Sequence, residues 1–421
     1  MTPNPGLGRH LGTFDAVILG LTSMIGAGIF ACFAPAAEAA GAGLMIGLAI
    51  AAAVAFCNAT ASAQLAAQYP EAGGTYVYGR ERLGEWVGFL AGWSFVVGKT
   101  ASCAAMALTF ATYAAPAGWL RPVAVTAVVV LAAVNYRGVT RTAGLARIIV
   151  VFIMMTLLLV VIAGAAGKDP DGGINNPDLF AEGWYGILQS AGLLFFAFAG
   201  YARIATMGEE VKRPQRTIPL AIMTALMITL AIYTLIGFTL LYAIGPDRLA
   251  SSGAPLAELV SVSGWSWADP IVRAGAAAAS LGALLALLTG VGRTGLAMAR
   301  NHDLPGWLSA VHPTFAVPHR AELALAVIVS ALVVTVDLRG AIGFSSFGVL
   351  LYYLIANASA FTQGGDRRRY PKALQVVGAI GCLALVATLP TGSIVGGLVA
   401  LGVGAGGRLI RVNRTRGAAS R

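Results

Sequence analysis

The stretch Ser23-Met-Ile-Gly-Ala-Gly-Ile-Phe30 places two glycines, Gly26 and Gly28, in the middle of a long apolar block. Glycine costs about 1 kcal/mol in a helix interior relative to alanine, and it permits irregular backbone. A helix that is interrupted here exposes N–H groups at its new N-terminus, which attract a carboxylate. The carbonyls freed at the other half-helix attract an ammonium group. The stretch therefore indicates a broken helix whose main chain can bind a zwitterion.

The composition around this stretch is that of a membrane protein. Of the 421 residues, 57% are hydrophobic and only 11% are charged, and the mean hydropathy is +0.78. A soluble protein carries about 25% charged residues, and a helix needs about 17–25 apolar residues to span a bilayer. Because backbone groups in lipid must be satisfied within the chain, each apolar block is expected to be a helix. A β-barrel would instead show alternating segments of about ten residues.

We predict an all-α polytopic fold with twelve transmembrane helices. The predicted spans are 14–34, 42–67, 86–113, 121–136, 143–166, 185–206, 217–243, 269–299, 322–337, 341–362, 373–389 and 391–410. Between spans seven and eight, residues 246–265 are expected to form an outer loop with a short amphipathic helix. The first apolar block has no cleavage-type site after it, so we expect it to be a permanent span.

The distribution of positive charge predicts the orientation. The net charge is +10, and 20 of the 28 lysines and arginines fall in segments on one side of the predicted spans, against 4 on the other. Positive residues are enriched in cytoplasmic segments. Both termini are therefore predicted to be cytoplasmic, in the plasma (inner) membrane. This topology accounts for the basic net charge, and we expect the basic C-terminal segment to contact anionic lipid. We therefore expect no nucleic-acid partner.

A second glycine-containing interruption is predicted in span six, at Phe195-Phe-Ala-Phe-Ala-Gly-Tyr201. Breaks in spans one and six fit an inverted repeat of two five-helix units with a binding site at mid-membrane. The repeats would be residues 14–166 and 185–362, followed by two appended helices at 373–410. Residues 1–13 and the basic segment 411–421 would be cytoplasmic. Glycines of this kind also serve as close-packing faces between helices, which is the alternative interpretation.

Four stretches in order resemble the amino acid–polyamine–organocation (APC) superfamily of permeases, especially its cationic amino acid transporter-like branch. They are Gly26–Phe30; Tyr69–Tyr76 with Gly92-Trp93; Phe195–Gly200 continuing through Gly208–Pro219; and Gly292–Thr294 with Ala297–Pro305. The resemblance implies a leucine-transporter-type fold with a 5+5 inverted repeat, alternating access, and a substrate held between the two broken helices.

The resemblance also implies roles for individual residues. Amides around Gly26, Ala27 and Gly28 would bind the substrate carboxylate. Carbonyls near Met24, Phe196, Ala197 and Ala199 would bind its amine. The aromatic residues Phe195, Phe198 and Tyr201, like Phe196, would close or line the pocket; ordinary helix packing is the alternative for each of them.

Two ionisable residues within the spans are further candidates, because a charge in the membrane usually marks function. Lys99 lies near the middle of span three. We predict that it supplies a positive charge and exchanges a proton during the cycle, since burial disfavours the charged form of a lysine. A fixed lysine bound to free carbonyls is the alternative. Arg203, just after the span-six break, is predicted to line the inner vestibule; a place near the pocket, where it would disfavour dicationic substrates, is the alternative.

These observations favour a secondary transporter of amino acids, by proton-linked symport or by exchange. A polyamine or monoamine carrier is the alternative. The chain carries no catalytic constellation of an enzyme, no charged ring or filter of a channel, and no nucleotide-binding loop. Its four cysteines lie in apolar blocks and its four histidines lack metal-ligand spacing, so we expect neither metal nor cofactor.

Overall fold

The computed structural model describes most of the chain. The described residues are 11–26, 28–70, 73–137, 143–167, 178–208, 210–315, 317–365 and 368–419. In this part of the protein, every regular element is a helix, and one isolated parallel bridge joins Leu11 to Val211. The predicted all-α polytopic fold is confirmed.

The helices follow one another along the chain with short connections. The first half contains α1 (Thr13–Ile25), α2 (Gly28–Ala31), α3 (Phe33–Ala40), η1 (Gly41–Gly43), α4 (Leu44–Gln68), α5 (Thr75–Leu83), α6 (Glu85–Ala114), α7 (Leu120–Tyr136) and α8 (Ala143–Ala166). The second half contains α9 (Gly183–Phe198), η2 (Ala199–Tyr201), α10 (Ala202–Ala205), α11 (Pro214–Ser251), α12 (Pro255–Val262), η3 (Ser266–Ala268), α13 (Asp269–Arg300), η4 (Gly306–Ser309), α14 (His319–Thr335), α15 (Leu338–Phe361), α16 (Lys372–Thr388) and α17 (Thr391–Ala419).

Each predicted span coincides with helical structure, although some boundaries differ. Among the described residues, nine helical segments are long and apolar enough to cross a membrane, and α7 and α16 are shorter apolar helices. The first pass continues in α3 as far as Ala40, beyond the predicted end at 34, and α17 continues to Ala419 through most of the predicted basic segment. The expected amphipathic helix between spans seven and eight is α12, and a turn at Gly245 (φ 73°, ψ 166°) separates it from the main part of α11.

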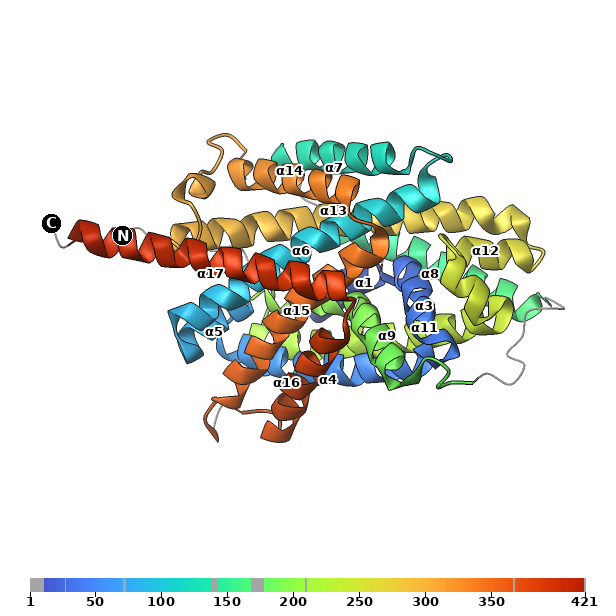
Figure 1. Cartoon of the computed structure of the whole chain (residues 1–421), viewed down its shortest axis with the longest axis horizontal. Coiled ribbons are helices and arrows are strands. Elements are labelled where there is room, and N and C mark those ends of the chain that lie inside the picture. The colour runs from blue at the N-terminus through green and yellow to red at the C-terminus, as the bar shows by residue number, and fades with distance from the viewer. Residues whose placement is uncertain are drawn as a thin grey trace.

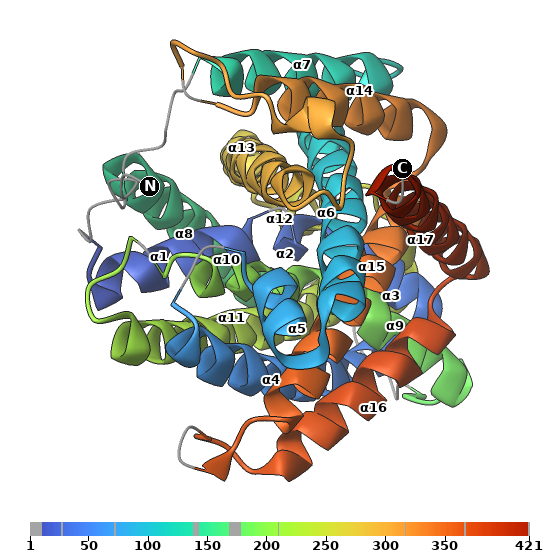
Figure 2. The same ribbon diagram turned by 90° about the vertical axis from the view of Figure 1, so that its left-hand side faces the viewer.

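The helices are arranged around α6 and α13. Figure 1 shows α7 and α14 side by side along one edge of the molecule, and these two helices are in contact. In the end-on view of Figure 2, α1, α4 and α11 lie on the opposite side, with α6 and α13 between the two groups. The large cluster of buried apolar side chains that forms the core is contributed mainly by α1, α3, α4, α6, α9, α11, α13 and α15.

Helices α6 and α15 approach each other through small residues. A Cβ on Gly98 would lie 3.1 Å from the Cα of Gly348, and a Cβ on Gly348 would lie 2.7 Å from the Cα of Gly98. One turn further on, the hydroxyl groups of Ser102 and Ser345 are 2.6 Å apart. Small residues allow such close approach between membrane helices. This contact fixes the rotation of α6, and hence the direction of Lys99, which follows Gly98.

A buried ionic cluster joins the last helix to the rest of the protein. The carboxylate of Asp303, just after α13, is 3.0 Å from Arg80 and 3.1 Å from Arg408 on α17. Tyr76 donates a hydrogen bond to the same carboxylate at 2.7 Å, and burial raises the pKa of Tyr76 to about 12, so it stays protonated. Arg408 also donates to the carbonyl of Glu85 at 2.8 Å. The cluster ties α5, α6, α13 and α17 together at one end of the bundle.

Candidate functional site

The first helix is interrupted at the glycine pair. Helix α1 ends at Ile25, Gly26 has φ −38° and ψ −131°, and α2 begins at Gly28. The carbonyl of Met24, in the last turn of α1, accepts a hydrogen bond from the hydroxyl of Tyr233 on α11. Ala27 lies outside the described residues. The chain therefore leaves α-helical geometry between Ile25 and Gly28, as the sequence predicts.

The second interruption follows α9. The α-helix ends at Phe198, a 3₁₀ turn covers Ala199–Tyr201, and α10 resumes at Ala202 for a single turn. The carbonyl of Ala199 accepts hydrogen bonds from the Lys99 ammonium at 3.2 Å and from the Tyr353 hydroxyl at 3.4 Å. Both donors come from helices outside the interrupted segment, so its freed main-chain acceptor is bound by other parts of the protein.

The two interruptions lie against each other. A Cβ added to Gly200 would be 2.3 Å from the carbonyl oxygen of Ser23 and 2.6 Å from the nitrogen of Met24. A Cβ on Gly28 would be 2.8 Å from the Cα of Ala197. Tyr233 links the same two segments, because its hydroxyl donates to the carbonyls of both Met24 and Ala197. Glycine is needed at positions 28 and 200 because only a missing side chain allows the two main chains this close.

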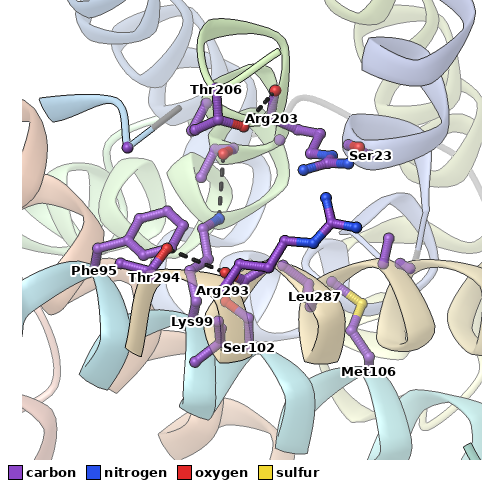
Figure 3. Close-up of a pocket in the computed structure, with 18 of the residues that line it drawn as sticks. Ser23, Phe95, Lys99, Ser102, Met106, Arg203, Thr206, Leu287, Arg293 and Thr294 are labelled. Carbon is purple, nitrogen blue, oxygen red and sulfur yellow. Dashed lines mark hydrogen bonds between the residues drawn. The ribbon is translucent and has the colours of Figure 1, made fainter. Parts of the chain in front are cut away.

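A cavity of about 270 Å³ opens beside this junction (Figure 3). Its wall takes residues from α1, α6, η2, α10 and α13. The lining residues are Ser23, Gly73, Phe95, Lys99, Ser102, Met106, Phe196, Ala199, Gly200, Ala202, Arg203, Thr206, Glu210, Ala283, Ala286, Leu287, Gly290, Val291, Arg293, Thr294 and Ala297. The volume is near the lower end of the range for small-molecule sites, which is about 300–1,000 Å³. The cavity can hold one small metabolite.

Lys99 is the buried charged group of this cavity. It lies on α6, is 6% exposed, and extends into the cavity, where its ammonium reaches the Ala199 carbonyl (Figure 3). Among the described residues, no carboxylate lies within ion-pair distance of Lys99, so main-chain and solvent dipoles must stabilise its charge. The structure thus places Lys99 at the span-six break, and both interpretations of this residue, proton exchange and a fixed lysine, stay predictions.

Two arginines enter the cavity from opposite walls. Arg203 comes from α10 and Arg293 from α13, and in Figure 3 their guanidinium groups point toward each other. Glu210 also lines the cavity, and its carboxylate is 4.0 Å from Arg293. Arg203 lines the cavity, and its place in an inner vestibule stays a prediction. The sequence analysis did not predict that Arg293, near the C-terminal end of α13, converges with Arg203.

Several predicted site residues pack behind the cavity wall. Of the predicted binding residues, Phe196 and Ala199 line the cavity, whereas Met24, Gly26, Gly28 and Ala197 do not. The three remaining aromatic candidates are fully buried and pack on tyrosines. Phe195 and Tyr201 contact Tyr353, and Phe198 contacts Tyr233. In this conformation these aromatic residues support the broken segments, and their roles in binding or gating stay predictions.

The sequence analysis did not single out Tyr233 or the α13 wall. Tyr233 bridges the two breaks with one hydroxyl, and Ala283, Ala286 and Gly290 form a smooth surface of the cavity. For Tyr233, the available signal in the sequence was a tyrosine within an apolar span. Small residues spaced three and four apart on α13 were a signal for the second, because they leave room beside a helix.

Comparison with known proteins identifies the family. The sequence model of the amino acid permease family matches residues 11–405. The chain belongs to the amino acid permease family. The resemblance to the APC superfamily is thereby confirmed, and the protein is a membrane transporter of that family.

Individual relatives differ in the substrates that their names give. An uncharacterized transporter of Mycobacterium tuberculosis is 58% identical over 94% of this chain and 90% of its own length. The branched-chain amino acid permease BcaP of Bacillus subtilis is 26% identical over 94% of this chain and 92% of its own. The chloroplastic cationic amino acid transporter 7 of Arabidopsis thaliana is 27% identical over 84% of this chain and 65% of its own. Within the amino acid permease family, these relatives therefore span neutral and cationic substrates.

Proposed function

We propose that this protein is a secondary active transporter that carries amino acids by alternating access, as a proton-linked symporter or an exchanger. The observation that carries the proposal is the cavity at the junction of the two interrupted helices. Its wall includes Ser23, in the last turn of α1 before the first break, and Ala199 and Gly200 from the second. Membership of the amino acid permease family supports the substrate class.

In the proposed binding mode, the main chain of the two breaks holds the zwitterion. Free amides around Gly26 to Gly28 bind the carboxylate, and carbonyls of Phe196 and Ala199 bind the ammonium group. Gly26 and Gly28 lie behind the wall in the present conformation, with Gly28 packed on Ala197. Full engagement of the substrate therefore requires the two broken segments to separate. Such a movement is what alternating access needs.

In the proposed proton coupling, Lys99 is the titrating group. Its ammonium is bound to the Ala199 carbonyl, which is one of the expected acceptors for the substrate amine. A protonated Lys99 and a substrate ammonium would compete for this carbonyl, and the two cations would repel each other. Substrate binding and proton release are then linked through one acceptor.

The experiment is counterflow in proteoliposomes, with the full chain purified and reconstituted. Labelled amino acids of acidic, neutral and basic side chains are tested alongside putrescine as a polyamine, with and without a pH gradient. Exchange of at least one amino acid, with stimulation by a pH gradient in the symport case, is the expected result. Exchange of putrescine alone would instead favour a polyamine carrier, and absence of any exchange would refute the proposal.

A further inference from the structure

We propose that Arg203 and Arg293 form an anion-binding subsite in the cavity, and that the substrate is an amino acid whose side chain carries a carboxylate. This inference rests on the proposed function, and it names the substrate class of the same cavity. It also separates this protein from relatives whose names give neutral or cationic substrates.

The first argument is the charge of the cavity wall. Among the described residues that line it, Lys99, Arg203 and Arg293 carry positive charge and Glu210 carries negative charge. The Glu210 carboxylate is 4.0 Å from Arg293, at the limit of an ion pair, and it offsets that guanidinium only in part. The cavity therefore keeps an excess of positive charge. The Arg293 side chain is 48% exposed and that of Glu210 30%, so water screens part of this field, but the excess still attracts anions and repels cations.

The second argument is the geometry of the two arginines. Their guanidinium groups come from α10 and α13 and point toward each other across the cavity (Figure 3). Within the described part of the chain, no carboxylate lies within ion-pair distance of Arg203. Two facing cations repel each other, and an anion between them is attracted by both. The planar guanidinium fork matches a carboxylate, which can accept two hydrogen bonds from each arginine.

The third argument concerns the place left for the rest of the substrate. The Ala199 carbonyl and Phe196 lie at the junction of the breaks, where the ammonium end is proposed to bind, and the arginines lie further along the same cavity. Along α13, Ala286, Leu287 and Gly290 lie between Ala283, which packs on Gly26 at the first break, and Arg293, and they offer no side-chain hydrogen bond. A substrate with its amine at the junction and a second carboxylate a few bonds away fits this sequence of polar, apolar and cationic surfaces.

The same features disfavour a basic side chain. A lysine or arginine substrate would bring a second positive charge of its own, and the one carboxylate among the described lining residues, that of Glu210, already faces Arg293. The protein's own Lys99 already contacts the carbonyl at the break. No acidic group among the described lining residues is left to pair with a cationic substrate.

The experiment compares glutamate, leucine and lysine as counterflow substrates of the reconstituted full-length protein. We expect glutamate to exchange and lysine not to. Arg203→Gln and Arg293→Gln should each raise the KM for glutamate about tenfold or more, because each removes one charge-assisted contact. Arg203→Lys keeps the charge but not the planar fork, and should restore only part of the affinity that Arg203→Gln loses. Arg300→Gln is the matched control for Arg293→Gln. Arg300 lies on α13 like Arg293, but it is exposed and does not line the cavity.

A charge reversal gives a result that loss of folding could not imitate. Arg203→Glu should lower glutamate exchange and allow lysine exchange, with monodisperse elution in detergent as the check on folding. Exchange of leucine or lysine but not glutamate by the wild-type protein would overturn the anion subsite and leave the proposed function intact. So would unchanged glutamate KM in both glutamine variants. Absence of exchange for all three amino acids would overturn the proposed function itself.

Discussion

The contact between the two helix breaks gives the sharpest test of the structure, through the substitution Gly200→Ala. The added Cβ would lie 2.3 Å from the Ser23 carbonyl oxygen and 2.6 Å from the Met24 nitrogen, whereas ordinary van der Waals contact begins near 3.4 Å. All the close atoms belong to the main chain, so no side chain can rotate away. The first helix and the 3₁₀ turn must move apart by about an ångström, and overpacking of this kind costs about 1–3 kcal/mol.

This cost falls on the conformation in which the two breaks touch. A free energy of about 1–3 kcal/mol changes the population of one state by about 5- to 150-fold relative to another. If the transport cycle passes through the contact state, Gly200→Ala should slow counterflow by a factor in that range. A second readout uses Thr294→Cys, because Thr294 lines the cavity. The rate at which a membrane-impermeant maleimide alkylates this cysteine is measured. The native cysteines are buried and should not react.

The control for this test lies in the same cavity. Gly290→Ala adds the same methyl group on α13, and its Cβ would meet no atom within 4 Å. We expect Gly290→Ala to transport at close to the wild-type rate. Equal rates and equal alkylation for Gly200→Ala and the wild type would refute the close approach of the two breaks, and with it the proposed site.

Three further predictions address other features. Lys99→Met should make amino acid exchange insensitive to a pH gradient, whereas Lys372→Met, at an exposed lysine on α16, should leave the pH response as it is; retained pH dependence in Lys99→Met would contradict the coupling role. Asp303→Asn leaves Arg80 and Arg408 without their shared carboxylate and should destabilise the protein by about 3–5 kcal/mol, measured as a lower Tm in detergent. Tyr233→Phe removes the hydroxyl that is hydrogen-bonded to the carbonyls of Met24 and Ala197, and should lower the free energy of unfolding by about 1–3 kcal/mol. The same thermal assay measures this, and an unchanged Tm would show that the bridge does not stabilise the protein.

The sequence was sufficient to predict the spans and both interruptions. The interruptions lie at glycines inside apolar blocks, namely Gly26, Gly28 and Gly200. Lipid would otherwise impose a continuous helix there, so a glycine that permits irregular backbone can be recognised from its immediate sequence. The structure places their breaks in contact, which the sequence could suggest only through the inverted-repeat pattern. What makes the contact possible is the absence of a side chain, and this is visible at once in a sequence.

The partners of the ionisable residues could not be predicted in the same way. Lys99 was recognised because of its depth in a span, but its acceptor is the carbonyl of Ala199, one hundred residues away, and every residue has such a carbonyl. Arg203 lies on α10 and Arg293 on α13, and they face each other only because the fold places both helices on the wall of one cavity. A polar residue within a span can therefore be noticed from sequence, while its partner depends on the three-dimensional arrangement.

The position of Lys99 leads to a consequence for which substrates can drive the cycle. Its ammonium donates to the Ala199 carbonyl at the break, the group proposed to accept the substrate amine. An amino acid that arrives there brings a second cation to one acceptor, so the two charges interact unfavourably unless Lys99 releases its proton or moves away. A dicarboxylate without an amine could still bind between Arg203 and Arg293, but it would not displace Lys99. Such a compound should therefore act as a competitive inhibitor of exchange without causing proton movement, which a pH-sensitive dye inside the vesicles can measure.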